Sequence, residues 1–465
     1  MRPFPRRLTL VAALAPVVAL GLPANSYGVP MRTGAVNHLP GDGLRTAPVT
    51  ATASAVRLNN FRLIGHNNLG DFRDYADVWG HGDAAYVGTR CGERGNGGAG
   101  VKVLDISDPT RPRIVSTLPN PRYSRAEDVV VHHVETRFFK GELALVGIQQ
   151  CFQALDQGHA AQYTGLQFFD VTQPARPVLL GAWKLPHTSG ADELPAIGCH
   201  EIDLVQRPGG RVLAGCARNL IDQAFNNSAG VHFVDASNPR NPQQISQFSL
   251  PADPFSAGVG CFKATFDHSV RFVNGGRTAY LSYWDAGTVR LDLAEPARPR
   301  LVAKVKITPP DEDGDNHSMT LANGGKWLVI NPEDFSPFDR PCKKFDGYGE
   351  AYVYDNTNPA RPRYLGSFAT PSTHSTRTDG AFTVHNTEVV QGRQFFSSWY
   401  SDGIVWWTMR DNGASYMKGQ FVPPANQYGS PLVWGVYPDS RHDVILASDF
   451  TSGLWIVKPV GLGNF

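Results

Sequence analysis

The chain has 465 residues, 42% hydrophobic and 18% charged, which provides a large core and excludes wholesale disorder. Lys and Arg total 43 against 42 Asp and Glu, a net charge of +1 without a long block of one sign, which argues against nucleic acid as a partner. The 47 glycines, 35 prolines and 11% aromatic residues indicate many turns and few long helices, as in an all-β protein.

Residues 1–28 have the pattern of a bacterial export signal. Arg6 and Arg7 precede an apolar run over Leu8–Leu22, which is too short to span a membrane and has the length of a signal-peptide core. The arginine pair is compatible with either the Sec or the twin-arginine route. Residues 29–55, rich in Gly, Thr, Ala and Pro, are typical of a linker. No transmembrane segment is predicted, so we expect a secreted protein.

One phrase recurs along the rest of the chain, and its clearest copy is Gly100-Val-Lys-Val-Leu-Asp-Ile-Ser-Asp-Pro-Thr-Arg-Pro112. A glycine-led strand is followed by a turn in which Asp or Ser caps the backbone and Pro fixes φ. The copies begin at residues 100, 165, 230, 287, 350, 403 and 453. Repeats of this spacing predict a propeller or a solenoid.

Each unit also contains a strand after the turn and a hairpin before the phrase, such as the hairpin around Asn274-Gly275-Gly276. Four antiparallel strands per unit predict a seven-bladed β-propeller over residues 56–465. The last unit stops at its third strand, Leu454–Val457, and an unmatched stretch, Asn60–Gly65, resembles a fourth strand. Pairing these two segments would close the ring with an N-terminal strand and leave no open edge.

The repeated phrase resembles the LVIVD repeat of exported bacterial β-propellers. The resemblance covers about residues 56–465, and five of the seven copies keep most of the phrase. Gly403–Gly413 lacks the Asp and both prolines, which leaves the turn of the sixth blade open. The resemblance implies a fold and export, but no shared activity, because function is not set by fold.

A column of histidines stands at the start of the predicted innermost strands, at the mouth of the central channel. Four consecutive units carry His200, His268, His317 and His385 in equivalent positions. The other three units have Ala76-Asp77, Glu127-Asp128 and Trp434-Gly435 there. We therefore predict that four imidazoles face one axis.

Neutral imidazole binds copper, iron and zinc, and a set of histidines with an open position is typical of a catalytic metal site. Glu127, Glu201 and Glu388 are candidates to orient the rings. A ring of histidines hydrogen-bonded only to water and backbone is the structural alternative. Motifs for nucleotide binding are absent from the sequence, so no nucleotide cofactor is expected.

Six cysteines without a C-x-x-C pair fit disulfides in an oxidising compartment. All fall near the same rim in this register. We expect the bridges Cys91–Cys151, Cys199–Cys216 and Cys261–Cys342, among the 15 connectivities that six cysteines allow.

Two functions remain open. The first is a secreted metalloprotein, such as a metal-dependent oxidase or oxygenase of a small molecule at the histidine face. The arrangement resembles, without their motifs, the four-histidine iron site of carotenoid-cleaving oxygenases and the histidine-based copper site of selenium-binding-protein-type thiol oxidases. The second is a non-catalytic, monomeric propeller that binds a protein, glycan or surface through insertions such as Gln153–Tyr163 and Pro332–Asp346.

Overall fold

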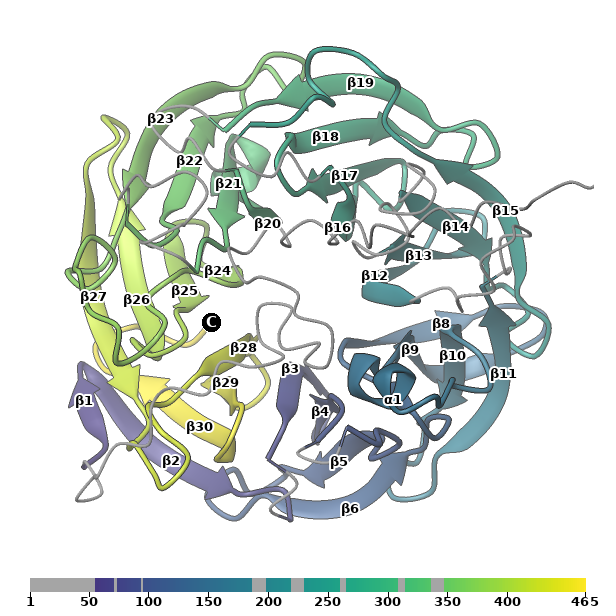
Figure 1. The fold of residues 1–465 in the computed structure, drawn as a ribbon, viewed down its shortest axis with the longest axis horizontal. Helices are drawn as coiled ribbons and strands as arrows, with labels where there is room; N and C mark the ends of the chain where they lie inside the picture. Colours follow the sequence, from purple (N-terminus) through teal and green to yellow (C-terminus); the bar gives the residue numbers. More distant parts are fainter. Residues whose placement is uncertain are drawn as a thin grey trace, which may run out of the picture.

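The computed structural model of the protein describes residues 55–70, 73–92, 95–185, 198–218, 230–259, 265–307, 314–335 and 347–465. Within these ranges the strands form seven antiparallel sheets that surround a central axis as blades (Figure 1). The predicted all-β, seven-bladed propeller is confirmed. The expected export signal and all but the last residue of the expected linker lie outside the described residues.

The first four blades follow one another along the chain. Blade 1 contains β3 (Tyr75–His81), β4 (Ala84–Thr89), β5 (Val101–Asp105) and β6 (Arg113–Leu118). Blade 2 contains β7 (Ser124–Arg125), β8 (Val129–Glu135), β9 (Lys140–Gln150), β10 (Gly165–Asp170) and β11 (Val178–Lys184), with the short helix α1 (Phe152–Asp156) after β9. Blade 3 contains β12 (Cys199–Gln206), β13 (Val212–Arg218), β14 (Val231–Asp235) and β15 (Gln243–Phe248). Blade 4 contains β16 (Asp267–Val273), β17 (Thr278–Tyr283), β18 (Gly287–Asp292) and β19 (Arg300–Val305).

The remaining three blades complete the ring. Blade 5 contains β20 (Asn316–Ala322), the 3-10 turn η1 (Asn323–Gly325), β21 (Trp327–Pro332), β22 (Ala351–Asp355) and β23 (Arg363–Phe368). Blade 6 contains β24 (Thr387–Val390), β25 (Gln394–Ser398), β26 (Ile404–Met409), β27 (Ser415–Val422) and β1 (Arg57–Asn59). Blade 7 contains β28 (Val433–Asp439), β29 (Val444–Asp449), β30 (Gly453–Pro459) and β2 (Phe61–Asn67).

The ring closes through the N-terminal strand, as predicted. β2 pairs antiparallel with β30, with Leu63 opposite Val457 and Gly65 opposite Ile456. The sequence did not predict that β1 would also pair with β27, which gives blade 6 a fifth strand. The two N-terminal strands thereby become the outermost strands of the last two blades.

The repeated phrase forms the turn between the third and fourth strands. In blade 1, Asp105 Oδ1 accepts the Ser107 N–H at 2.9 Å, and Asp105 Oδ2 binds Arg113 across the turn at 2.8 Å. The turn also contacts the preceding blade, because an added Cβ at Gly65 would lie 2.1 Å from the Pro109 carbonyl oxygen. A glycine is therefore required at that contact. In blade 6, where the phrase is lost, the turn closes through Gly413 in the left-handed region, at φ 82°.

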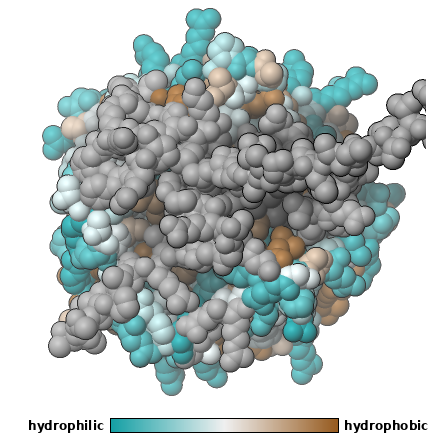
Figure 2. Space-filling view, in the orientation of Figure 1, coloured by the Kyte–Doolittle hydropathy of each residue, from teal (hydrophilic) through white to brown (hydrophobic). Residues whose placement is uncertain are grey.

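Two of the expected disulfides are present, Cys91–Cys151 between blades 1 and 2 and Cys199–Cys216 within blade 3. The expected third pair, Cys261 and Cys342, lies outside the described residues. Among the described residues no helix is long and apolar enough to cross a membrane. Hydrophilic side chains project around much of the circumference of the disc (Figure 2).

Candidate metal centre

A β-bulge at the start of the innermost strand positions the histidine column. In blade 4, Asp267 pairs with Tyr283 and Ser269 pairs with Ser282, so His268 has no partner in the ladder. The same register shift falls between Cys199 and Ile202 in blade 3 and between Asn316 and Ser318 in blade 5. A bulge bends the strand and redirects a side chain, and here it places the imidazole at the end of the central channel.

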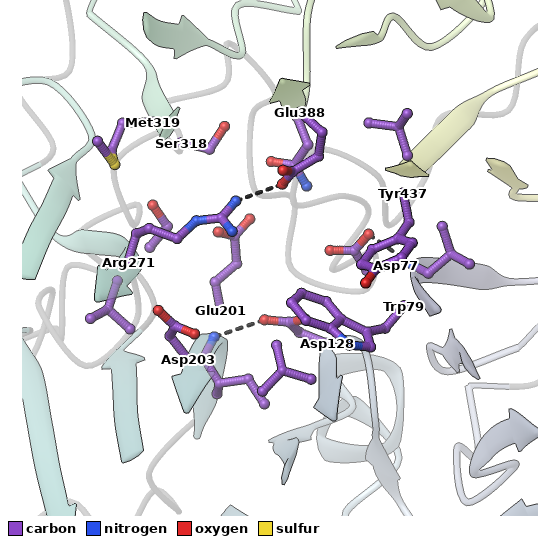
Figure 3. A pocket seen from close by; sticks show the side chains of 17 residues that line it. Asp77, Trp79, Asp128, Glu201, Asp203, Arg271, Ser318, Met319, Glu388 and Tyr437 are labelled. Atoms are coloured by element: carbon purple, nitrogen blue, oxygen red, sulfur yellow. Dashed lines mark hydrogen bonds and ion pairs between the residues drawn. The ribbon is translucent and has the colours of Figure 1, made fainter. Parts of the chain in front are cut away.

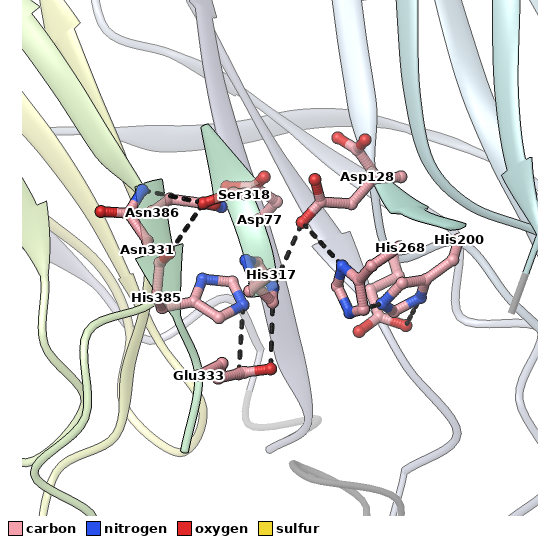
Figure 4. A network of polar contacts seen from close by, with 12 residues as sticks. Asp77, Asp128, His200, His268, His317, Ser318, Asn331, Glu333, His385 and Asn386 are labelled. Atoms are coloured by element: carbon pink, nitrogen blue, oxygen red, sulfur yellow. Dashed lines mark hydrogen bonds and ion pairs between the residues drawn. The ribbon is translucent and has the colours of Figure 1, made fainter. Parts of the chain in front are cut away.

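The structure brings the four predicted histidines together as an arc (Figure 4). Neighbouring ring centroids are 4.3 Å apart for His200 and His268, and 4.1 Å apart for His268 and His317 and for His317 and His385. All four residues are at least nine-tenths buried. The rings follow one another around the axis, each from its own blade.

Two glutamates lie between the imidazoles and turn the arc into a mixed nitrogen and oxygen site. Glu201 Oε1 is 3.3 Å from His317 Nε2 and 3.8 Å from His268 Nδ1. Glu333 lies 3.7 Å from His317 Nε2 and 3.6 Å from His385 Nε2. The side chains form two overlapping groups, Glu201-His268-His317 and His317-Glu333-His385, each with its potential ligand atoms within 4.8 Å of one another.

His200 has a different position from the other three histidines, because its ring is engaged on both sides. Its Nε2 is 2.8 Å from His268 Nε2, and its Nδ1 is 3.0 Å from Gln149 Nε2. Because Gln149 Oε1 accepts from Arg125 Nε, the Gln149 amide donates to His200 Nδ1, and the Nε2–H of His200 then donates to His268 Nε2. Such a chain fixes the tautomer of a metal ligand, which makes His200 a positioning residue.

The electrostatics of the site favour neutral groups. Burial lowers the pKa of all four imidazoles below the ordinary 6.5, to about 3 for His385. The charges of Arg125 and Arg90 lower the pKa of His200 further. Burial also raises the pKa of Glu201 and Glu333 well above 4.5. Neutral imidazole is the form that binds metal, and a buried carboxyl group releases its proton when a cation arrives.

Several buried ring nitrogens lack a hydrogen-bond partner. They are Nδ1 of His268, Nδ1 of His317 and both nitrogens of His385. Buried polar atoms are almost always satisfied, so a cluster of unsatisfied ones beside two carboxyl groups needs a physical reason. A bound metal ion would engage one lone pair on each ring, because a neutral imidazole keeps a proton on its other nitrogen.

Aromatic side chains close the ends of the arc. Trp284 lies 5.1 Å from His268 and Trp434 lies 4.4 Å from His385, as centroid distances. Tyr400 packs edge-on against His385 and donates its hydroxyl to Glu333 Oε1. Its backbone φ is +39°, a conformation that is rare for a bulky residue. The strained backbone is held by a β-bridge to Val433 in the next blade.

The three predicted orienting glutamates have different surroundings. Glu127 Oε2 lies 3.7 Å from His200 Nδ1 and 3.0 Å from Arg125 Nε, so it is close to the arc. Glu201 lies within the arc as a potential ligand. Glu388 forms an ion pair at 2.7 Å with Arg271 in a separate layer of the channel (Figure 3), so its carboxylate is directed away from the imidazoles.

Sequence reasoning missed Glu333 and Gln149. Glu333 directly follows β21 and precedes Asp334, at the rim to which the histidines belong, so its place at a strand end was the available signal. Gln149 lies near the end of β9 without a repeated counterpart that would single it out.

Comparisons with known proteins add no functional assignment. No protein-family model and no curated protein matches the chain. A solved structure of a protein from Lactobacillus plantarum resembles it with a TM-score of 0.48 and 13% identity, over 75% of this chain and 87% of that one. A candidate 6-phosphogluconolactonase from Bacteroides uniformis gives a TM-score of 0.48 and 13% identity, over 76% of this chain and 86% of that one. Likenesses of this size carry no argument about activity.

Proposed function

We propose that the protein is a secreted propeller of the LVIVD type that binds a transition metal, copper, iron or zinc, in its histidine arc. The observation that supports this proposal best is the pair of overlapping His/Glu groups, which bring His268, His317 and His385 together with Glu201 and Glu333 and include the unpaired Nδ1 of His268 and Nε2 of His385. Imidazole and carboxylate together suit a borderline metal, whereas calcium and magnesium prefer oxygen alone.

The disulfides support export. Cys91–Cys151 and Cys199–Cys216 join neighbouring strands or blades, and such bridges persist in oxidising compartments. The Cys199–Cys216 bridge is next to His200 in the chain. It therefore holds the start of β12, from which both His200 and Glu201 project.

We assign the site to an oxidase or oxygenase acting on a small molecule. A bound copper or iron ion would supply redox chemistry there. The chain contributes an enclosed site, since Trp284, Tyr400 and Trp434 pack against the imidazoles and limit access of water. Tyr400 donates its hydroxyl to Glu333, which orients that carboxyl group beside His317 and His385.

The test is the metal content of the full, untagged protein purified from its exporting host without added metal. We expect near-stoichiometric copper, iron or zinc in the natural protein and none after the double substitution His268→Ala/His317→Ala. His232→Ala is the matched control, because His232 is also buried but packs against Trp183, away from the arc. That variant should keep its metal.

Circular dichroism and the melting temperature establish whether the double variant keeps its fold. A natural protein that contains no metal and takes up none on titration with Zn²⁺ or Cu²⁺ would contradict the proposal. Equal metal content in the natural protein and the double variant would also contradict it.

A further inference from the structure

A second layer of polar residues lies in the central channel next to the histidine arc. It surrounds a cavity of about 50 Å³, seen in Figure 3. Space of this size accommodates about three to five water molecules, well below the volume that a drug-sized substrate requires. The cavity is therefore suited to a small ion with part of its water shell.

Six oxygen-bearing side chains line the cavity from one position of the repeat, the residue directly after the histidine column. They come from six consecutive blades and are Asp77, Asp128, Glu201, Ser269, Ser318 and Asn386. The equivalent residue in blade 7 is Gly435, where an added Cβ would lie 2.5 Å from Asp77 Oδ1. The glycine thus leaves room for the carboxylate of the neighbouring blade.

The negative charge of this layer exceeds the positive charge that faces it. The cavity is lined by the carboxyl groups of Asp77, Asp128, Glu201, Asp203 and Glu388 and by the guanidinium of Arg271. Arg271 is paired with Glu388, and Asp203 accepts the backbone N–H groups of Leu204 and Phe272.

Asp77 and Asp128 form no direct ion pair among the described residues, although the charge of Arg271 lowers the pKa of Asp77. Each accepts a backbone N–H at 2.8 Å, from Val78 and Ile202 respectively. Burial raises the pKa of Asp128 well above 3.8, and the charge of Asp77 raises it further. The pKa of Asp77 rises to about 7 for the same primary reason, burial. Two buried carboxyl groups that repel each other are a site where a cation would be stabilised.

Ser269 provides an independent sign of a ligand. It is only 5% exposed and lines the cavity. None of the side-chain hydrogen bonds among the described residues involves its hydroxyl, so the hydroxyl is available to a ligand in the cavity. A hydrated cation in the cavity would bind this hydroxyl oxygen directly or through one of its water molecules.

We propose that this cavity binds a hard divalent cation, Ca²⁺ or Mn²⁺, through Asp77, Asp128, Glu201 and Ser269. All four donors are oxygen atoms, which is the ligand chemistry that such ions prefer. This site goes beyond the transition-metal binding proposed above and does not depend on it. Glu201 is the side chain common to both, because it lines the cavity and also lies 3.3 Å from His317.

The experiment is calorimetric titration of the full protein, freed of metal by chelation, with Ca²⁺ and separately with Mn²⁺. We expect one ion per chain with a Kd below about 1 mM, the range of extracellular calcium modules, and a higher melting temperature when Ca²⁺ is present. Asp77→Asn/Asp128→Asn should abolish both effects, since the amides still accept the two backbone hydrogen bonds but carry no charge.

Two control variants establish whether the ion binds in this cavity. Asp402→Asn removes a carboxyl group that is 4% exposed and lies outside the cavity, and it should leave Ca²⁺ binding unchanged. His268→Ala/His317→Ala should lose transition-metal binding and retain Ca²⁺ binding. Failure of the transition-metal site and failure of this site are thereby distinguishable.

Absence of Ca²⁺ and Mn²⁺ binding by the natural protein would overturn the proposal, as would unchanged binding by the double Asn variant. If that variant does not fold, the single change Asp128→Asn is tested by the electron paramagnetic resonance signal of bound Mn²⁺. If Asp128→Asn gives the same signal of bound Mn²⁺ as the natural protein, the proposal is overturned.

Discussion

The histidine arc and the acidic layer are adjacent in the channel and come from adjacent positions of the repeat, yet their chemistry differs. The arc presents imidazoles from blades 3–6 together with Glu201 and Glu333, and the proposed ligands of the acidic layer are oxygen atoms from blades 1–4. Burial acts on both in the same direction, toward the neutral form, because it lowers the pKa of the imidazoles and raises the pKa of the carboxyl groups.

Two adjacent positions of the repeat, the histidine position and the residue after it, therefore present two kinds of metal-binding chemistry to one channel. Soft or borderline ions are expected in the arc and hard ions in the acidic layer. Glu201 is the point where the two layers meet. Substitutions on either side of it test whether the layers are separate.

The largest effect is expected for Glu201→Gln. The change removes the charge shared by the two layers. We expect the affinity for both Zn²⁺ and Ca²⁺ to fall by a factor of at least about 100. Titration of each ion into the same metal-free sample measures both losses. An effect confined to one ion would show that Glu201 serves a single layer.

A smaller effect, of opposite sign, is expected for Asp77→Asn in the metal-free protein. The pKa of Asp77 is raised from 3.8 to about 7, so its contribution to stability is present below about pH 4 and is lost as the pH rises toward 7. At about pH 8 the ionised carboxylate is unfavourable, and Asn should stabilise the fold by about 1–3 kcal/mol.

Urea unfolding at about pH 8 and about pH 4 checks this sign. At the lower pH the carboxyl group is protonated in the folded chain and about two-fifths protonated in the unfolded chain, so the two proteins should have nearly equal stability. Destabilisation by Asn at both values would mean that Asp77 is held mainly by its hydrogen bond to Val78.

The smallest effect is expected for His200→Gln. Because His200 contacts His268 and Gln149 rather than a carboxylate group of the two triads, it should act by orienting His268. We expect about 10-fold weaker Zn²⁺ binding, unchanged Ca²⁺ binding and a shifted ligand-field spectrum of bound Co²⁺. Complete loss of Zn²⁺ binding would instead identify His200 as a direct ligand.

The sequence supported the fold in detail because its signals are repeated. The Asp-Pro turns marked five of the seven blades, and the truncated last unit matched the N-terminal strand that became β2. β1 was missed because three residues without the repeated phrase carry no signal of their own.

The site was only partly predictable. The histidines share one residue type in one column, so alignment of the repeats revealed them. The acidic layer was missed as a site because its column holds an acidic residue in only three blades, as Asp77, Asp128 and Glu201, and Ser, Asn or Gly in the other four. Glu333 reaches the arc from the end of a second strand, outside the aligned column, and only the folded chain brings it to His317 and His385.

The most direct test of metal binding in the arc is titration of the metal-free, full-length protein with Co²⁺, followed by visible absorption. We predict saturable d–d bands of an ion with nitrogen and oxygen ligands, displaced by Zn²⁺ and absent in His317→Ala, the variant that removes the histidine common to both triads. Titration without new absorption, or identical bands in His317→Ala, would contradict metal binding in the arc.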